Sequence, residues 1–355
     1  MIGDVRLGYR PALDGVRGVA ILLVLAWHFG GWPHGAFLGV HVFFVLSGFL
    51  ITTLLLEEWD GSGTVSLRQF WRRRALRLLP ALFVAITAYL LILVAEAATG
   101  VGTWHDAARP LLAAVAGVLY FSDALFAAGV LHEKSGLGQL WSLSVEEHFY
   151  LLWPPLLVVL LRRRITARRL LGGLALVVGA LFAARIAFTA GGEWRLLYFG
   201  PPVFDSIVVG CAAGYALSRG LLPSVRRFVA PSLVFIALAT LIPELWQVAP
   251  AFAIACAIVL VDLTQTRSRL AALLSSGPLV YVGRISYSLY LWHPIAWVLL
   301  HHAVLPATAA SFAAAAASHR FVERPFLRRK RRPEPERLDR LGSPLARPAD
   351  GLVSA

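Results

Sequence analysis

Long apolar runs separated by short polar segments recur along almost the whole chain of 355 residues. A helix that crosses a bilayer needs about 20 predominantly apolar residues, and most of these runs reach or approach that length. The pattern predicts an all-α integral membrane protein, a polytopic helical bundle with no separate soluble domain. Eleven segments are candidate spans, at residues 12–30, 37–56, 78–98, 111–128, 144–161, 170–190, 202–218, 228–243, 248–263, 278–300 and 307–322.

The composition of the chain agrees with a membrane protein. Of all residues, 58% are hydrophobic and only 15% are charged, whereas a soluble domain carries about 25% charged residues. The net charge of +13 comes largely from arginines that lie between the apolar runs. The positive-inside rule places such clusters on the cytoplasmic side of a membrane, so the excess charge does not indicate nucleic acid. The clusters cover residues 72–77, 162–169, 219–227, 267–269 and 328–332.

The same clusters predict a topology. If residues 1–11 form a cytoplasmic N-terminus, counting one crossing for each apolar segment puts every arginine cluster on the cytoplasmic side, except between residues 78 and 161. Three segments lie there between two cytoplasmic flanks, so we expect the short segment 111–128 to be re-entrant. This gives about ten transmembrane helices and two cytoplasmic termini; eleven crossings with one misplaced cluster is the alternative. Residues 12–326 then form the membrane domain, and the Arg- and Pro-rich residues 327–355 form a disordered cytoplasmic tail.

The first apolar segment carries ionisable residues at helical spacing. Arg17 and His28 are eleven residues apart, which is close to three helical turns, so they share one face about 16 Å apart along the axis. Asp14 precedes Arg17 by three residues and lies within reach of an ion pair. An ionisable residue inside a membrane is a candidate functional residue. There are structural alternatives: Asp14 and Arg17 can form a pair whose side chains extend to the lipid headgroups, and His28 can be a hydrogen-bonded histidine of the core.

Two arginines and one glutamate add candidate chemistry further along the chain. Arg74 and Arg77 are three residues apart and share a helical face, where two guanidinium groups can bind phosphate oxygens. Anchoring of the following span by positive charge is the alternative. Glu146 shares a face with Tyr150, and a carboxylate at this position can orient a histidine or accept a proton. The neighbouring Glu147 fits a capping box at the start of its span.

Other polar positions carry less specific signals. Ser47 precedes Gly48, a residue that lets another membrane helix approach closely. Tyr287 and Tyr290 share a face and His293 precedes a proline, for which aromatic anchoring at the membrane surface is the structural explanation. The sequence contains no HExxH, P-loop, dinucleotide-binding or CxxC motif, so we expect no metal site and no bound cofactor.

Six segments, in their order and spacing, resemble acyltransferase family 3, a family of membrane O-acyltransferases that act on bacterial surface polysaccharides, other glycans and macrolides. The resemblance covers about residues 10–326. It rests on the segments LDGVRGVAILLVLAWH, FFVLSGFLI, RRRALRLLP, WSLSVEEHFYLLWP, ISYSLYLWHP and FVERPF. Each motif alone is weak, whereas the ordered set is specific.

The resemblance implies a set of site residues. His28 matches the family's essential histidine and Glu146 the glutamate of the Trp-Ser-Leu segment, so both are expected to be catalytic. Arg17, Arg74 and Arg77 match positions thought to hold the acyl donor. Further residues are expected to support the site or to line its acceptor side: His41, Ser47, Tyr150, Tyr287, Tyr290 and His293.

The implied reaction moves an acyl group, acetyl in most members, from cytoplasmic acyl-CoA to a hydroxyl group. His28 would act as general base, oriented by Glu146; a covalent acyl-histidine is the minor variant. The expected partners are the bilayer, acyl-CoA as co-substrate, and a carbohydrate, glycolipid or secreted small molecule as acceptor, all at the bacterial cytoplasmic membrane. We see no appended esterase-like domain and expect a minimal form. A multi-span transporter or exporter of a glycan or acylated metabolite is the alternative.

Overall fold

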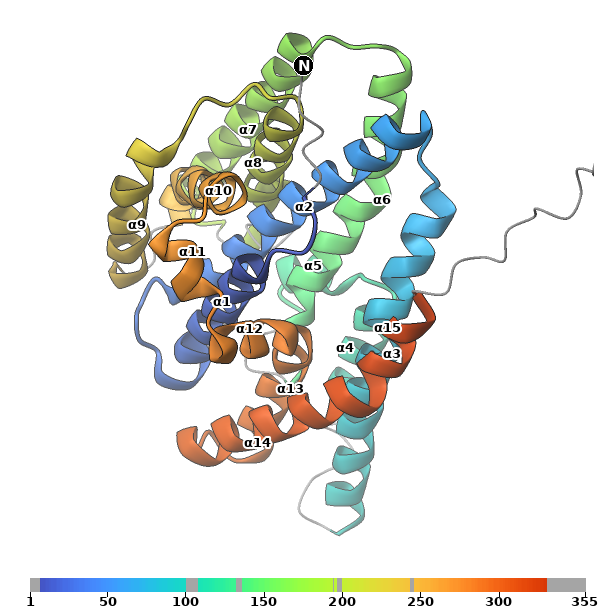
Figure 1. Ribbon diagram of the computed structural model, residues 1–355. Coiled ribbons are helices and arrows are strands. Elements are labelled where there is room, and N and C mark those ends of the chain that lie inside the picture. The colour runs from blue at the N-terminus through green and yellow to red at the C-terminus, as the bar shows by residue number, and fades with distance from the viewer. Residues whose placement is uncertain are drawn as a thin grey trace, which may run out of the picture.

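The structure is a computed structural model that describes residues 7–99, 108–131, 136–193, 195–196, 200–242 and 246–330. Throughout these ranges the regular elements are helices (Figure 1). They are α1 (Pro11–Gly30), α2 (Gly39–Ser62), α3 (Leu67–Ala98), α4 (Ala108–Val118), α5 (Ser122–Ala127), α6 (Leu140–Arg162), α7 (Ala167–Ala190), α8 (Gly200–Ser218), α9 (Arg226–Leu241), α10 (Ala249–Gln265), α11 (Arg269–Leu274), α12 (Gly277–Arg284), α13 (Ser286–Leu299), α14 (Val304–Ser318) and α15 (Arg324–Lys330). A π-helical turn, His319–Glu323, joins the last two.

Five helices are long and apolar enough to cross a membrane, namely α1, α2 with the short 3-10 turn before it, α3, α6 and α7. Shorter apolar helices include α4, α10 and most of α8. For the described residues, the predicted class of an all-α bundle with membrane-spanning helices is therefore confirmed. The count of ten crossings and the cytoplasmic placement of both termini stay predictions.

The structure divides two of the candidate segments, one of which, 111–128, was expected not to cross the membrane. Segment 111–128 forms α4 and α5, of 11 and 6 residues, separated by a turn at Tyr120 with a φ of 55°. Segment 278–300 forms α12 and α13, and α12 packs along α1. Each piece is shorter than the roughly 20 residues of a straight crossing, so neither segment is one continuous span.

Two predicted boundaries also move. The arginine cluster at 72–77 lies within α3, because this helix begins at Leu67, where the Ser66 side chain accepts a hydrogen bond from the backbone N–H of Gln69. Helix α15 continues to Lys330, into the region expected to be a disordered tail. The rest of that tail, residues 331–355, lies outside the described residues.

Helix α2 lies in the middle of the bundle, in contact with α8, α6 and α1 (Figure 1). Of its most apolar stretch, 72% is buried inside the protein, against 17% for α7, so α2 is central and α7 peripheral. A Cβ on Gly48 would overlap with the carbonyl oxygen of Ile207 on α8, and one on Gly210 with that of Val45 on α2. This close backbone contact confirms the expectation for Gly48 and is typical of membrane bundles.

Helix α1 is fixed in a similar way against α12. A Cβ on Gly283 would overlap with the carbonyl oxygen of Asp14. The Asp14 carboxylate accepts a hydrogen bond from the Tyr9 hydroxyl at 3.0 Å and lies 3.8 Å from Nε of Arg284. Asp14 is therefore tied to α12, and its predicted ion pair with Arg17 is not formed.

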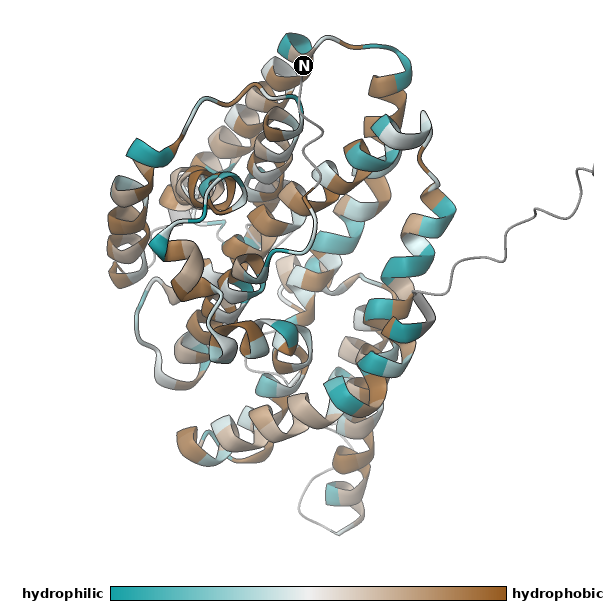
Figure 2. Cartoon of the chain, viewed as in Figure 1, coloured by the Kyte–Doolittle hydropathy of each residue, from teal (hydrophilic) through white to brown (hydrophobic). Residues whose placement is uncertain are grey.

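Hydropathy separates the parts of the bundle. Figure 2 shows several hydrophilic turns in the first part of α3 and on α15, whereas α9 and the second part of α3 are mostly hydrophobic. Large apolar side chains such as Leu91 on α3 and Leu176 on α7 are exposed on the surface of the protein. Exposed apolar side chains on long apolar helices suit contact with lipid.

Replacing Gly48 by alanine tests the contact between α2 and α8. The added methyl group has no free space, so the helices must move apart, and overpacking costs about 1–3 kcal/mol. We expect a lower melting temperature of the detergent-solubilised protein in a thermal-shift assay. Gly61, also on α2, has open space around it, so Gly61→Ala is the matched control. Equal melting temperatures for the two variants would contradict this packing.

Candidate active site

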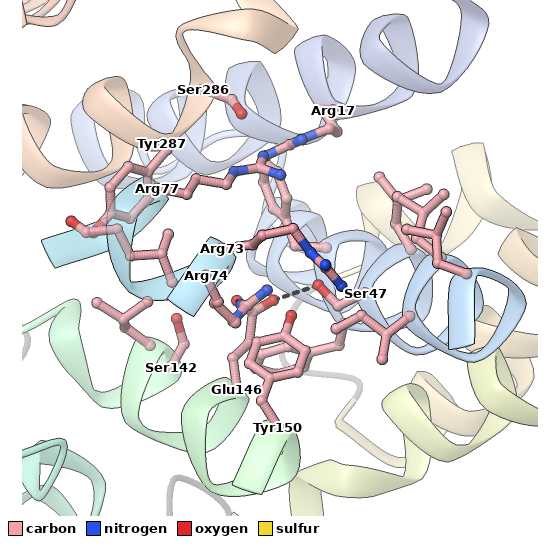
Figure 3. A pocket seen from close by; sticks show the side chains of 18 of the residues that line it. Arg17, Ser47, Arg73, Arg74, Arg77, Ser142, Glu146, Tyr150, Ser286 and Tyr287 are labelled. Carbon is pink, nitrogen blue, oxygen red and sulfur yellow. Dashed lines mark hydrogen bonds and ion pairs between the residues drawn. The ribbon is translucent and has the colours of Figure 1, made fainter. Parts of the chain in front are cut away.

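A cavity of about 230 Å³ lies between α1, α2, α3, α6 and α13 (Figure 3). Helix α2 forms the longest wall, from Val40 to Glu58, and each of the other helices contributes a shorter stretch. Helices α3 and α6 are joined beside the cavity by Trp71, whose Nε1 donates a hydrogen bond to the carbonyl oxygen of Tyr150 at 3.1 Å. Helix packing thus brings residues that are far apart in the sequence into one chamber.

The cavity brings together most of the predicted site residues. Its apolar walls are interrupted by the charged side chains of Arg17, Glu58, Arg73, Arg74, Arg77 and Glu146. Its hydroxyl groups come from Ser47, Ser142, Tyr150, Ser286, Tyr287 and Tyr290. Four guanidinium groups outnumber two carboxylates, so the lining carries a net positive charge. In an apolar bundle such a charge acts over a longer range than it does in water.

Arg74 is the best-paired arginine of this group. Its Nε donates to Oε1 of Glu147 at 2.9 Å, and its Nη2 lies 3.5 Å from Oε2 of Glu146. Its Cζ lies 3.0 Å from the centre of the Tyr150 ring, which adds a cation–π contact. Glu147 is therefore an ionic partner and not a helix cap, because α6 begins at Leu140, well before this residue. The charge of Arg74 is balanced within the protein.

Arg17 and Arg77 are arranged differently. Their guanidinium groups reach toward each other from α1 and α3 (Figure 3). Neither forms a hydrogen bond or ion pair with any residue in the described part of the chain, whereas Arg73 pairs with Glu58 at 3.4 Å. Arg74 and Arg77 thus both line the cavity but differ in their pairing, and Arg17 and Arg77 are the arginines of the lining that form no ion pair with a described residue.

Glu146 lines the cavity, where its carboxylate interacts with a serine and an arginine. Its Oε1 accepts a hydrogen bond from the Ser47 hydroxyl at 2.8 Å, and its Oε2 faces Arg74. Within the described residues, the hydrogen-bond partners of Glu146 are Ser47 and Arg74, and its orientation of His28 stays a prediction. The carboxylate links α2, α3 and α6.

His28 lies outside the cavity lining, beside His293, the second of the histidines that were predicted to belong to the site. The two rings are 4.9 Å apart at 68°. Nδ1 of His28 lies 2.8 Å from the carbonyl oxygen of Val24, and Nδ1 of His293 lies 3.0 Å from that of Leu289. A carbonyl oxygen only accepts hydrogen bonds, so both Nδ1 atoms carry the proton and both Nε2 atoms are the basic ones. Nε2 of His293 is buried and has no hydrogen-bond partner among the described residues.

Tyr290 lies between the cavity and the histidine pair. It lines the cavity, and its ring centre is 5.9 Å from that of His293. Its hydroxyl is hydrogen-bonded to Oγ of Ser142 and donates to the carbonyl oxygen of Gln139, which fixes α13 against the start of α6. The hydroxyl of Tyr287, also on α13, donates a hydrogen bond to the carbonyl oxygen of Leu78 on α3 at 2.9 Å. The position of the histidines relative to the cavity therefore depends on Tyr290.

His41 belongs to a separate polar network that is completely buried. Its Nδ1 lies 2.8 Å from Oγ of Ser206, which contacts the Asp205 carboxylate at 3.1 Å. Asp205 in turn forms an ion pair of 2.7 Å with Arg185. The network joins α2, α7 and α8 outside the cavity lining. Sequence reasoning missed Arg185 and Asp205, although both are charged residues inside apolar segments, the same signal that singled out Arg17.

Comparison with known proteins assigns the chain to a family. A family model described as an acyltransferase domain matches residues 10–318. This protein belongs to that acyltransferase family. The matched part runs from α1 to the end of α14, so it contains every residue of the cavity lining and both histidines of the pair. The resemblance that the sequence motifs indicated is thereby confirmed.

Relatives of this acyltransferase-family protein are named as O-acetyltransferases of peptidoglycan. The peptidoglycan O-acetyltransferase OatA of Listeria monocytogenes is 32% identical over 361 residues, covering 90% of this chain and 56% of the relative. YrhL of Bacillus subtilis, provisionally named a peptidoglycan O-acetyltransferase, is 30% identical over 352 residues, with 90% and 55% covered. The chain thus spans about half the length of the curated relatives it matches. No solved structure matches it.

Replacing Arg74 by alanine tests its structural role. The change leaves Glu146 and Glu147 close together without their cation, and breaking such a pair costs about 3–5 kcal/mol when it is fully buried. The Arg74 side chain is 17% exposed, so we expect a cost toward the lower end and a clearly lower melting temperature. Arg72→Ala removes an exposed arginine of the same helix and should leave the melting temperature unchanged. A normal melting temperature for Arg74→Ala would rule out the pairing as a major stabilising contact.

Proposed function

We propose that this protein is a membrane O-acyltransferase that moves an acetyl group from acyl-CoA to a hydroxyl group of a carbohydrate. The observation that carries the proposal is the positively charged cavity beside the histidine pair, in which Arg17 and Arg77 face each other and neither forms an ion pair with a described residue. Membership of the acyltransferase family and the names of its relatives support it. A peptidoglycan sugar is the acceptor that those names suggest for this chain.

The donor site follows from charge. Two guanidinium groups that face each other repel, and the repulsion is strong where little water screens it. A phosphate group between Arg17 and Arg77 removes this repulsion and accepts several charge-assisted hydrogen bonds. Acyl-CoA carries its phosphates at one end and its thioester at the other, joined by a long arm. With the phosphates at the two arginines on the cytoplasmic side, the arm extends along α2.

The proposed chemistry uses the basic nitrogen of His28. Its Nδ1–H is held by the carbonyl oxygen of Val24, so Nε2 takes the proton of the acceptor hydroxyl as its oxygen attacks the thioester carbon. The new C–O bond forms and the C–S bond breaks. The departing CoA thiolate then takes the proton from His28, which restores the neutral histidine.

Replacing Arg77 by glutamine tests the donor site. The change removes a charged donor that we place against a phosphate, and such a hydrogen bond contributes about 1.5–3 kcal/mol. We expect KM for acetyl-CoA to rise at least 10-fold in an assay of free CoA thiol released by purified protein. Arg17→Gln should act in the same direction. Arg168 is an exposed arginine at the start of α7, so Arg168→Gln is the control, and equal KM values in all three variants would refute the donor site.

Replacing His28 by alanine tests the general base. Loss of a general base lowers the rate about 10²–10⁴-fold, so we expect kcat for CoA release to fall by that factor while the protein stays folded. His34 is exposed near the end of the same helix, and His34→Ala should keep full activity. Unchanged kcat in His28→Ala would exclude the base. Wild-type protein that never releases CoA from acetyl-CoA would contradict acyl transfer and favour transport.

A further inference from the structure

The cavity is long, and its two ends differ in chemistry. Its wall on α2 extends from Val40 to Glu58, eighteen residues or about 27 Å along the helix axis. The Glu58 end carries the ion pair with Arg73. At the Val40 end the wall is mostly apolar, with Phe43 beside Val40 and Leu143 on α6, and its polar groups are the hydroxyls of Ser142 and Tyr290, which bind each other. A phosphate group suits the charged part, whereas a small, mostly apolar group suits the Val40 end.

The Val40 end is also the end nearest to His28. A Cβ on Gly39 would overlap with the carbonyl oxygen of Ala20 and lie 3.1 Å from Cγ2 of Val24. The first turn of α2 therefore lies against residues 20–24 of α1, and the carbonyl oxygen of Val24 binds the His28 ring. Val40 and Phe43 pack against an apolar cluster that α1 and α13 share. The members of this cluster on these two helices include Val24, Leu25, Phe29 and Leu289. Phe43 and Val40 therefore have the cavity on one side and the surroundings of the histidine on the other.

One side chain at the Val40 end, Tyr290, is held in place by hydrogen bonds and packs against the same apolar cluster as Val40 and Phe43. Tyr290 lines the cavity there, and both of its hydroxyl contacts, to Ser142 and to the carbonyl oxygen of Gln139, lie on or next to α6. Breaking them to admit a larger group would leave polar atoms without partners. The Phe43 ring has no hydrogen-bonding group, so it occupies space at this end without a polar contact that holds it.

We propose that the Val40 end of the cavity is the acyl pocket, and that Phe43 limits the acyl group to short chains. This inference rests on the proposed function, since it assigns the thioester end of the same donor site. The substrate class is a short-chain acyl-CoA, acetyl in preference to butyryl or longer. Each further methylene must displace the Phe43 ring or the fixed Tyr290, and a close-packed wall resists such overpacking. Pockets of this kind discriminate about 10–200-fold per methylene.

The test compares acetyl-, butyryl- and hexanoyl-CoA as donors for purified full-length protein, by CoA release. Phe43→Ala should raise the ratio of kcat/KM for butyryl-CoA over acetyl-CoA at least 10-fold relative to wild type. Phe43→Leu should shift the ratio in the same direction by less, and it serves if the alanine variant does not fold. Phe83 is an exposed phenylalanine of α3 outside the cavity lining, so Phe83→Ala is the control of matched size and should keep the wild-type ratio.

The outcomes separate this inference from the function on which it rests. A wild-type enzyme that releases CoA, together with folded Phe43 variants of unchanged chain-length preference, overturns the acyl pocket alone. An equal shift in Phe83→Ala overturns it as well, because the effect would then not depend on the cavity. A wild-type protein that releases no CoA from any donor overturns both proposals. Only a shift confined to the Phe43 variants supports the assignment.

Discussion

The cost of holding a charged side chain in an apolar bundle governs how this site is built. Arg74 lies between α3 and α6, and a cation in such a place needs close partners. Glu146 and Glu147 supply the two carboxylates, and the Tyr150 ring covers a face of the guanidinium group. These contacts join α3 to α6, so they also set the direction in which the other arginines of α3 extend.

Helix geometry then divides the arginines into two kinds. Three residues along a helix turn a side chain by about 60° from its starting direction, which is enough for Arg74 to meet α6 while Arg77 meets α1. Arg77 reaches Arg17 there instead of a carboxylate. One arginine of the Arg-x-x-Arg motif is thus used for structure, and the other contributes to the net positive charge of the cavity.

The histidine pair on α1 and α13 lies next to the cavity, and its geometry is set by the two helices. Each ring gives its Nδ1–H to a carbonyl oxygen one helical turn earlier, so the helices themselves select the protonated nitrogen. Tyr290 stands between this pair and the cavity, held to α6 by its hydroxyl. The site is therefore assembled from α1, α2, α3, α6 and α13, all within the part of the chain that matches the acyltransferase family.

The sequence by itself determined the all-helical membrane class, the shared faces of residues within one helix, and the family. The apolar periods and the spacing of residues such as Arg17 and His28 are properties of a single helix, so they can be read from the chain. Only the tertiary structure decided that Asp14 pairs with α12, that Glu146 accepts a hydrogen bond from Ser47, and that Arg74 is ion-paired. Those outcomes depend on which helix faces which, and the close glycine contacts that fix this packing join residues far apart in the sequence.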